Sequence, residues 1–224
     1  MAIEPTHLIF IDTEFTSLGD PSPVELISVG LCDSHGRPLF YAESDDFDPR
    51  LMSGFTREHV APLLQRGKFA MSYPDLCSGF LQAIRDFGEP CALASDSPWD
   101  WMWAQMMALG LRQASHAQVS DNPSTFPAWP SNLSPGRARL NFEGLPMVES
   151  AAALVASGEF FSKHHPHHAL SDAIANSLMC RAAISETPGL NPDDPSATCK
   201  MFGQNFASLA WDPRPSPTLG ASPC

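Results

Sequence analysis

The first part of the chain alternates between short apolar runs and turn residues, a pattern that predicts a sheet. Residues 7–11 are almost wholly apolar and β-favouring, which is typical of a short strand buried on both faces. Residues 24–31 have the same character, and the turn residues 34–37 (Ser-His-Gly-Arg) separate them from a mixed run at 38–43. The three runs therefore predict a meander of strands joined by hairpin-type connections.

The middle of the chain changes to a helical pattern. Apolar residues recur at helical spacing in two segments, 55–64 and 74–87. Residues 91–94 predict a fourth strand, and a helix is expected to follow over 98–109. Ser97 favours the N-cap position of that helix, and the proline after it favours the first helical position.

The second half of the chain mixes irregular and helical composition. Residues 111–146 are rich in Ser, Pro, Asn and Gly and have few periodic apolar positions, which is typical of a long irregular segment. Residues 147–157 predict a short helix, and residues 169–184 predict another. Because the second helix is apolar on nearly every side, it is expected in the interior.

Length and proline content predict one domain followed by a tail. A chain of 224 residues suffices for one sizeable core, and we place that domain at residues 1–185. Residues 186–224 are rich in proline, which favours an extended C-terminal tail. Within it, residues 201–211 are apolar enough to dock on the domain as a short helix.

Composition and charge narrow the class of protein. Hydrophobic residues make up 43% of the chain and charged residues 17%, which excludes a fully disordered chain. No apolar run approaches the ~18 to 20 residues that a membrane span requires. The formal charge of −12 argues against a surface that binds polyanions by charge alone, but it leaves open a nucleic-acid enzyme whose carboxylates hold divalent cations.

Cysteine usage and the first residues of the chain predict a cytoplasmic protein. The six cysteines are scattered without a C-x-x-C pair or zinc-ribbon spacing, so reduced thiols are expected. The sequence Met-Ala-Ile-Glu-Pro contains no basic region leading into an apolar stretch, and no small-residue cleavage signal follows it.

The first candidate site is a pair of acids at the end of the first predicted strand. Period-two geometry places Asp12 and Glu14 on the same face. Burial of two adjacent anions is costly unless one takes a proton or a cation lies between them. A divalent cation with oxygen ligands compensates both carboxylates. A pair of exposed strand-end acids is the alternative, and this motif alone supports it equally.

Two further aspartates stand out by their positions. Asp172 is the charged residue in an apolar stretch that is predicted to be an interior helix, where a structural salt bridge to an arginine is the alternative to a functional role. Asp100 lies three residues after Ser97, where it can complete a capping box, but acids also gather at this place in α/β sheets. Asp96 is either a supporting group of the same site or a turn residue.

Four histidines, at positions 164, 165, 167 and 168, precede the predicted helix that carries Asp172. Their spacing matches no H-E-x-x-H or H-x-x-E-H pattern, and adjacent histidines on a loop seldom converge on one ion, so no dedicated zinc site is predicted. His167 differs from its neighbours because it precedes Asp172 by five positions. This spacing places one imidazole near the mouth of the acidic cluster.

Three motifs together resemble the DEDDh group of DnaQ-like 3′-to-5′ exonucleases in order and spacing. They are Asp-Thr-Glu at 12–14, Trp-Asp at 99–100 and His-His-Ala-Leu-Ser-Asp at 167–172. The chain looks most similar to the small single-domain exoribonucleases of the mycobacterial adenylate-specific ribonuclease type. It differs from the proofreading exonucleases and oligoribonucleases because residues 15–18 are Phe-Thr-Ser-Leu, where those enzymes usually place a Thr-Gly pair.

The resemblance implies a fold, which covers about residues 7–185. That fold is α/β and ribonuclease-H-like, a mixed five-stranded sheet whose first three strands are antiparallel and whose faces are flanked by helices. The residues alone supply four strands, so a fifth is expected near Arg139 to Phe142.

The resemblance also implies a two-metal-ion mechanism. Asp12, Glu14, Asp100 and Asp172 would hold two divalent cations, Mg²⁺ or Mn²⁺, around the terminal phosphodiester. His167, neutral near pH 7, would take the proton from the attacking water, and the product would be a nucleoside 5′-monophosphate.

The implied substrate is single-stranded or 3′-overhang nucleic acid, RNA rather than DNA. Phe15 and Trp99 are the candidates for stacking on the terminal base, because stacking does not require positive charge. No membrane partner is expected. The resemblance leaves a homodimer open, since members of the resembled family are often dimers.

Two other functions stay open at the level of the sequence. One is a non-catalytic module on the same fold that binds nucleotides or metal, although all five expected catalytic positions are intact. The other is a metal-dependent phosphoesterase that acts on small phosphate esters. The D-x-D phosphatases of the haloacid-dehalogenase type are excluded, because position 14 is Glu.

Overall fold

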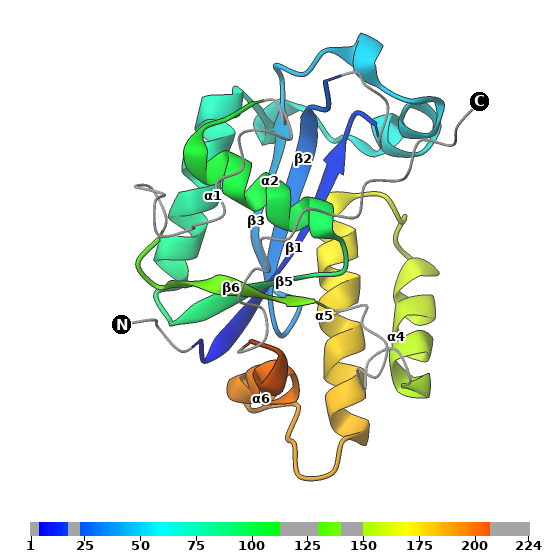
Figure 1. The fold of residues 1–224 in the computed structure, drawn as a ribbon. Coiled ribbons are helices and arrows are strands. Elements are labelled where there is room, and N and C mark those ends of the chain that lie inside the picture. The colour runs from blue at the N-terminus through cyan, green and yellow to red at the C-terminus, as the bar shows by residue number, and fades with distance from the viewer. Residues whose placement is uncertain (1–4, 18–22, 113–129, 140–149, 207–224) are drawn as a thin grey trace, which may run out of the picture.

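The computed structural model describes residues 5–17, 23–112, 130–139 and 150–206. Its centre is a mixed six-stranded sheet in the order β4-β3-β2-β1-β5-β6, and helices cover both faces (Figure 1). The predicted α/β class, with a mixed sheet flanked by helices, is confirmed. The strands are β1 (His7–Phe15), β2 (Leu26–Asp33), β3 (Pro38–Ser44), β4 (Ala70–Met71), β5 (Cys91–Ser95) and β6 (Leu133–Arg139).

The first three strands form the predicted antiparallel meander. β1 pairs with β2, and β2 pairs with β3, both in the antiparallel direction. Asp33 closes the turn between β2 and β3, because its carboxylate accepts hydrogen bonds from the amides of His35 and Arg37 at 2.8 and 3.0 Å. Gly36 occupies the left-handed region of that turn, at a φ of 74°. On its other side β1 pairs in parallel with β5, so it lies inside the sheet.

Two strands at the margins of the sheet differ from the prediction of five. β4 has only two residues, which pair in parallel with the end of β3, and so short a strand leaves no periodic pattern. β6 covers Leu133–Arg139, so it interrupts the segment predicted to be irregular and meets the predicted strand at Arg139, and the remaining predicted residues, 140–142, lie outside the described residues. Its Pro135 and Gly136 are typical of turns, but an edge strand tolerates them because, among the described strands, β6 has a partner on one side only.

The main helices begin and end at residues that the sequence marks. The hydroxyl of Ser72 caps the first helix, and Gly88 ends it in the left-handed region. Ser97 caps the second helix as predicted, and Gly110 ends it in the same way. The helices are α1 (Tyr73–Phe87), α2 (Pro98–Leu109), α4 (Ala151–Phe161), α5 (Ala169–Glu186) and α6 (Pro195–Phe206).

Two apolar clusters lie on opposite faces of the sheet. Ile9 and Ile11 of β1 belong to the cluster with α1 and α2, whereas Leu8 and Phe10 belong to the cluster with α5 and α6. Side chains alternate along a strand, so residues 12 and 14 continue the face of Leu8 and Phe10 toward α5. The core thus determines where the acidic motif of β1 points.

The helical segment predicted over 55–64 forms, but not as a regular α-helix. The chain instead forms a π-helical turn, η2 (Thr56–Val60), followed by a 3₁₀ turn, η3 (Ala61–Leu63). Pro62 lies at the start of η3, where it cannot donate the hydrogen bond that would continue the preceding helix. Two further 3₁₀ turns border this region, η1 (Pro49–Leu51) and η4 (Gly67–Phe69).

Two helices in the last third begin at other positions than predicted. α4 begins at Ala151, where the hydroxyl of Ser150 accepts a hydrogen bond from the amide of Ala153 at 3.0 Å, and residues 147–149 of the predicted helix lie outside the described residues. α6 begins at Pro195, ahead of the predicted 201–211, and buries Ala197 and Cys199 in the apolar cluster of α5. Residues 186–206 are therefore not wholly extended, and residues 207–224 lie outside the described residues.

The described cysteines, at positions 32, 77, 91, 180 and 199, are all buried and free, as predicted, and Cys224 lies outside the described residues. A search of the described helices finds none with the length and hydropathy of a membrane span.

Candidate metal centre

The acids of β1 lie just beyond the point where its pairing with β5 ends. The parallel pairing of β1 with β5 extends only to Phe10 and Ala94, whereas β1 itself continues to Phe15. Asp12 and Glu14 therefore project beyond the carboxyl end of β5, at the edge where α/β sheets bind ligands. Both residues are partly buried.

Asp100 reaches this edge from the first turn of α2. Its Oδ1 atom accepts hydrogen bonds from the amide and the hydroxyl of Thr13, at 3.0 and 2.7 Å. Thr13 lies between the two acids of β1, so these bonds place α2 directly beside the acidic motif. Asp100 is only 1% exposed, and the site thus gains a third, deeply buried carboxylate.

Asp172 and His167 reach the edge from the start of α5. The ring of His168 caps α5, with its Nδ1 atom 3.4 Å from the amide of Ser171. His167 has a φ of 66°, in the left-handed region, and its amide donates a hydrogen bond to Asp172 Oδ2 at 2.9 Å. The turn before α5 is therefore folded back onto the aspartate of its own helix.

The predicted site residues fall into two sets with metal-ligand spacing. Asp12, Asp96 and Asp100 form one set, and Glu14, His167 and Asp172 form the other. Within each set the ligand atoms all lie within 4.8 Å of one another. The structure thus brings together all five residues of the predicted catalytic set, which are separated by up to 160 positions in the sequence.

The donor atoms of these sets fit a divalent cation. Asp100 Oδ2 and Asp172 Oδ1 are buried and have no hydrogen-bond partner among the described residues. A buried carboxylate oxygen without a partner is costly, and a hard cation such as Mg²⁺ or Mn²⁺ supplies one. Carboxylate oxygens also dominate both sets, as such ions prefer.

Burial and mutual repulsion raise the pKa values of the cluster. Burial is the largest cause for each group, and it raises the pKa of Glu14 to about 8, of Asp100 to about 8 and of Asp172 to about 7. The pKa of Asp12 lies well above its ordinary value because of burial and the charges of all the neighbouring acids. The ionised cluster is therefore unfavourable unless positive charge is added.

In the absence of a divalent cation, we expect the protein to be less stable near pH 8 than near pH 5. The raised pKa values mean that the folded state binds more protons than the unfolded chain, whose carboxyl groups titrate near ~4, so the free energy of unfolding falls as the pH rises through this window. Thermal melts in EDTA measure the effect, and Mn²⁺ added near pH 8 should restore the melting temperature. A higher melting temperature near pH 8 than near pH 5 in EDTA would contradict it.

Among the four neighbouring histidines, His167 is the one in a ligand set. Its ring contacts Phe55 edge-on at 4.9 Å and lies 6.1 Å from the ring of His59, between ring centroids. Burial, followed by the charge of His59, lowers the pKa of His167, so the imidazole is neutral near pH 7. His164 stacks on Phe160 instead, with ring centroids 4.2 Å apart.

The two predicted stacking residues lie against each other. The rings of Phe15 and Trp99 are 5.8 Å apart and inclined by 38°. Phe15 follows Glu14 on β1, and Trp99 precedes Asp100 on α2, so the pair borders the carboxylates on the side where these two elements meet. Both rings are half-buried.

Several residues of the site have no clear signal in the sequence. Asp96 belongs to a ligand set, although its position in a Ser-Asp-Ser-Pro turn is equally typical of a turn residue. Thr13 anchors Asp100 through a contact that spans 87 positions in the sequence. Phe55 and His59 contact His167 from a segment more than 100 positions away in the sequence, a pairing that no local pattern reveals.

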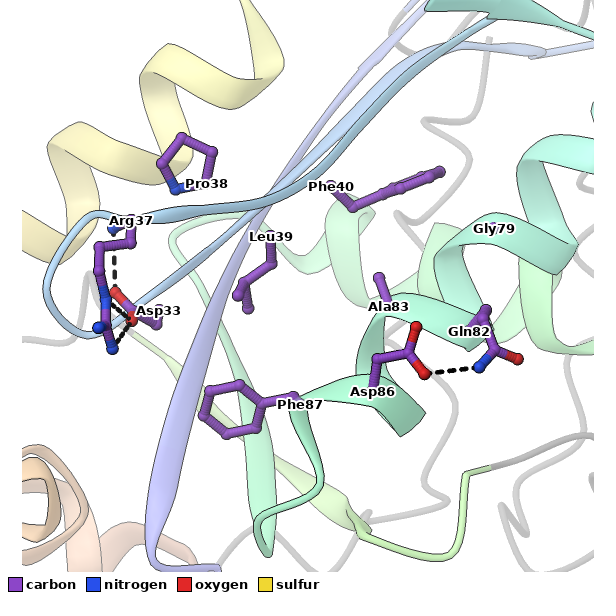
Figure 2. Close-up of a pocket in the computed structure, with 10 residues that line it drawn as sticks. All are labelled: Asp33, Arg37, Pro38, Leu39, Phe40, Gly79, Gln82, Ala83, Asp86 and Phe87. Atoms are coloured by element: carbon purple, nitrogen blue, oxygen red, sulfur yellow. Dashed lines mark hydrogen bonds and ion pairs between the residues drawn. The ribbon is translucent and has the colours of Figure 1, made fainter.

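A separate hollow of about 720 Å³ lies between the start of β3 and α1, as Figure 2 shows. Its polar groups already have partners, because Arg37 donates a hydrogen bond to Asp33 at 2.6 Å and Gln82 donates one to Asp86 at 2.7 Å. None of the acids of the two ligand sets lines it. The carboxylate cluster is therefore the candidate site.

Comparison with known proteins adds no assignment: no protein-family model matches the chain, and no curated protein matches it at a significant level.

Proposed function

We propose that this protein is a metal-dependent 3′-to-5′ exonuclease with a ribonuclease-H-like fold, and that single-stranded or 3′-overhang RNA is its preferred substrate. The observation that carries the proposal is the convergence of Asp12, Glu14, Asp100, Asp172 and His167 in two ligand sets. These residues come from β1, α2 and the start of α5. The antiparallel meander of β1, β2 and β3, with β5 parallel to β1, supports the ribonuclease-H-like part of the proposal.

Four carboxylates are the proposed ligands of two divalent cations, Mg²⁺ or Mn²⁺. Asp12 and Asp100 belong to one set, with Asp96 beside them, and Glu14 and Asp172 belong to the other. When bound, such ions lower the pKa of a water molecule and neutralise the charge of a phosphodiester. The carboxylates themselves hold these positions because Thr13 fixes Asp100 and the amide of His167 fixes Asp172.

His167 is the proposed general base. Its ring is neutral near pH 7 and lies within ligand distance of Glu14 and Asp172, so a ring nitrogen is available to take a proton from the attacking water. The water oxygen then bonds to the terminal phosphorus, and the bond from phosphorus to the 3′ oxygen of the shortened strand breaks. The product that leaves is a nucleoside 5′-monophosphate.

The aromatic pair of Phe15 and Trp99 is proposed to hold the terminal base. The pair borders the carboxylates, and aromatic rings stack on any base without requiring positive charge. Binding of the base by stacking suits an acidic protein, because it does not depend on positive charge.

The test is incubation of the protein with 3′-overhang RNA and the matching DNA in Mn²⁺, Mg²⁺ or EDTA, followed by resolution of the product ladder. We expect metal-dependent release of 5′-monophosphates from the 3′ end, faster from RNA, and no release by Asp12→Ala. Failure to shorten either polymer with any metal overturns the nuclease assignment. Hydrolysis of small monoesters in that case would indicate a phosphoesterase, and metal binding alone would indicate a non-catalytic module.

A further inference from the structure

The carboxylate cluster creates a problem for a polyanionic substrate, because its acids would repel the phosphates that follow the scissile one. The proposed divalent cations compensate the scissile phosphodiester, whereas positive charge for the phosphates that follow it has to lie on the rim of the site. Two segments form that rim in the described structure, residues 55–69 and the turn 162–168. Phe55 contacts His167 in the second segment, and the side chains of Gln65 and His168 approach to 2.9 Å.

These two segments carry basic side chains that have no carboxylate partner. Arg57, Lys68 and Lys163 are exposed, and none has an acidic group within ion-pairing distance among the described residues. Nearby Arg50 and Arg66 differ, because Asp48 and the pair of Glu43 and Asp45 neutralise them. In a chain with a formal charge of −12, three exposed cations without a carboxylate partner, in two segments that contact each other, are unexpected.

The turn that carries Lys68 is held in a defined shape. Glu43 is fully buried and accepts hydrogen bonds from the amides of Gln65 and Arg66, at 2.6 and 2.9 Å. These bonds stabilise Arg66 at a φ of 53°, a conformation that a residue with a side chain rarely adopts. The turn is thus a fixed support for the lysine that follows it.

Stacked rings connect this turn to the histidines of the site. Tyr41 contacts Phe69 at 5.3 Å and stacks on His168 at 4.6 Å, measured between ring centroids. Lys68 Nζ lies 4.9 Å above the ring of Phe69. The ammonium group is therefore linked to the turn of His167 through a short chain of packed side chains.

The remaining cations belong to the segment that contacts His167 and to the turn that contains it. Arg57 belongs to η2, whose neighbour Phe55 is 52% exposed and contacts His167 edge-on. Lys163 precedes His167 by four positions, just after the end of α4. An exposed aromatic ring among unpaired cations is typical of surfaces that bind single-stranded nucleic acid, since bases stack while phosphates pair with the charges.

We propose that Arg57, Lys68 and Lys163, named here the basic rim, bind successive backbone phosphates of a single-stranded nucleic acid whose 3′ end enters the carboxylate cluster. The rim therefore selects a polymer over a mononucleotide or a small phosphate ester. The proposal rests on the proposed function in one respect, namely that the 3′ end of the strand is the end that enters the carboxylate cluster. Binding by the rim, however, does not require hydrolysis and is measurable without it.

The test is fluorescence anisotropy of a labelled single-stranded oligoribonucleotide in EDTA, titrated at several salt concentrations. Three phosphate contacts predict that the logarithm of the association constant falls with the logarithm of salt with a slope of about −2, at ~0.7 for each contact. Each of Arg57→Gln, Lys68→Gln and Lys163→Gln should weaken binding about threefold to tenfold and reduce the slope by about 0.7. Lys200→Gln removes the same charge from α6, where Asp194 pairs with Lys200, and should change neither value.

The possible outcomes separate this proposal from the proposed function. Salt-dependent binding that weakens in the three variants, without any hydrolysis in Mn²⁺, supports the rim and overturns the nuclease. A variant that combines Arg57→Gln, Lys68→Gln and Lys163→Gln gives the second outcome. If it hydrolyses the polymer with an unchanged KM, the nuclease is supported and the rim is overturned. The rim is also overturned if the protein does not bind the oligonucleotide at low salt, or if Lys200→Gln weakens binding as much as the rim variants.

Discussion

We expect Asp100→Asn to lower the metal-dependent rate of 3′-end hydrolysis about a thousand-fold and to raise the melting temperature in EDTA. The rate falls because the substitution removes a carboxylate charge from the proposed cation site. Stability rises because Asp100 is 1% exposed and burial raises its pKa to about 8, so its charge opposes folding at neutral pH. Asn keeps the shape of the side chain and an oxygen that accepts the hydrogen bonds of Thr13.

The matched control for this prediction is Asp193→Asn. The side chain of Asp193 is 79% exposed and pairs with Arg181 near the end of α5, far along the helix from Asp172. The same chemical change should leave both the rate and the melting temperature in EDTA unchanged, because a surface ion pair contributes little. Product ladders and thermal melts measure the two effects. A fully active Asp100→Asn protein would remove Asp100 from the proposed metal site.

The opposite signs of these two effects have one cause. Groups arranged to hold cations repel one another when the cations are absent, and the raised pKa values of Glu14 and Asp172 express the same cost. A merely structural Asp100 would lower stability when replaced, since its hydrogen bonds to Thr13 would weaken. Stability and activity that change in opposite directions are therefore the expected signature of a site selected for function.

Local patterns predict the parts of this fold that depend on nearby residues. β1 is an apolar run that ends in an alternating acidic pair, and Ser97 with its following proline marks the start of α2, so both could be placed from the sequence. β6 could not, because its Pro135 and Gly136 favour a turn and only the pairing with β5 makes the segment a strand. β4 depends in the same way on the end of β3.

The candidate site shows the same division between local and long-range information. The order of the acidic motifs identifies Asp12, Glu14, Asp100 and Asp172 as candidates, because each stands out from its own surroundings. The sequence does not reveal that Thr13 joins two of these motifs, since a threonine between acids has no distinctive pattern. The rim is hidden as well, because the contact between Phe55 and His167 spans 112 positions in the sequence.

The close packing of α5 on the sheet depends on one small residue, Gly30 of β2. Gly30 pairs with Asp12 across the antiparallel ladder, so it lies next to the acidic motif. A Cβ atom at this position would lie 2.4 Å from both the N and Cα atoms of Leu170, in the first turn of α5. These are backbone atoms, so they cannot turn aside as a flexible side chain would. The close approach allows Asp172, two residues further on, to reach the acids of β1.

We therefore expect Gly30→Ala to reduce the free energy of unfolding by about 3 kcal/mol and to abolish metal-dependent hydrolysis in the protein that remains folded. The added methyl group must push the start of α5 off the sheet, which moves Asp172 and His167 away from Asp12. Denaturant unfolding measures the stability, and the product ladder measures the activity. Gly54→Ala is the control, since a Cβ atom there meets nothing within 4 Å. If Gly30→Ala unfolds at the same denaturant concentration as the unaltered protein, or keeps full activity, α5 does not depend on this contact to position its catalytic residues.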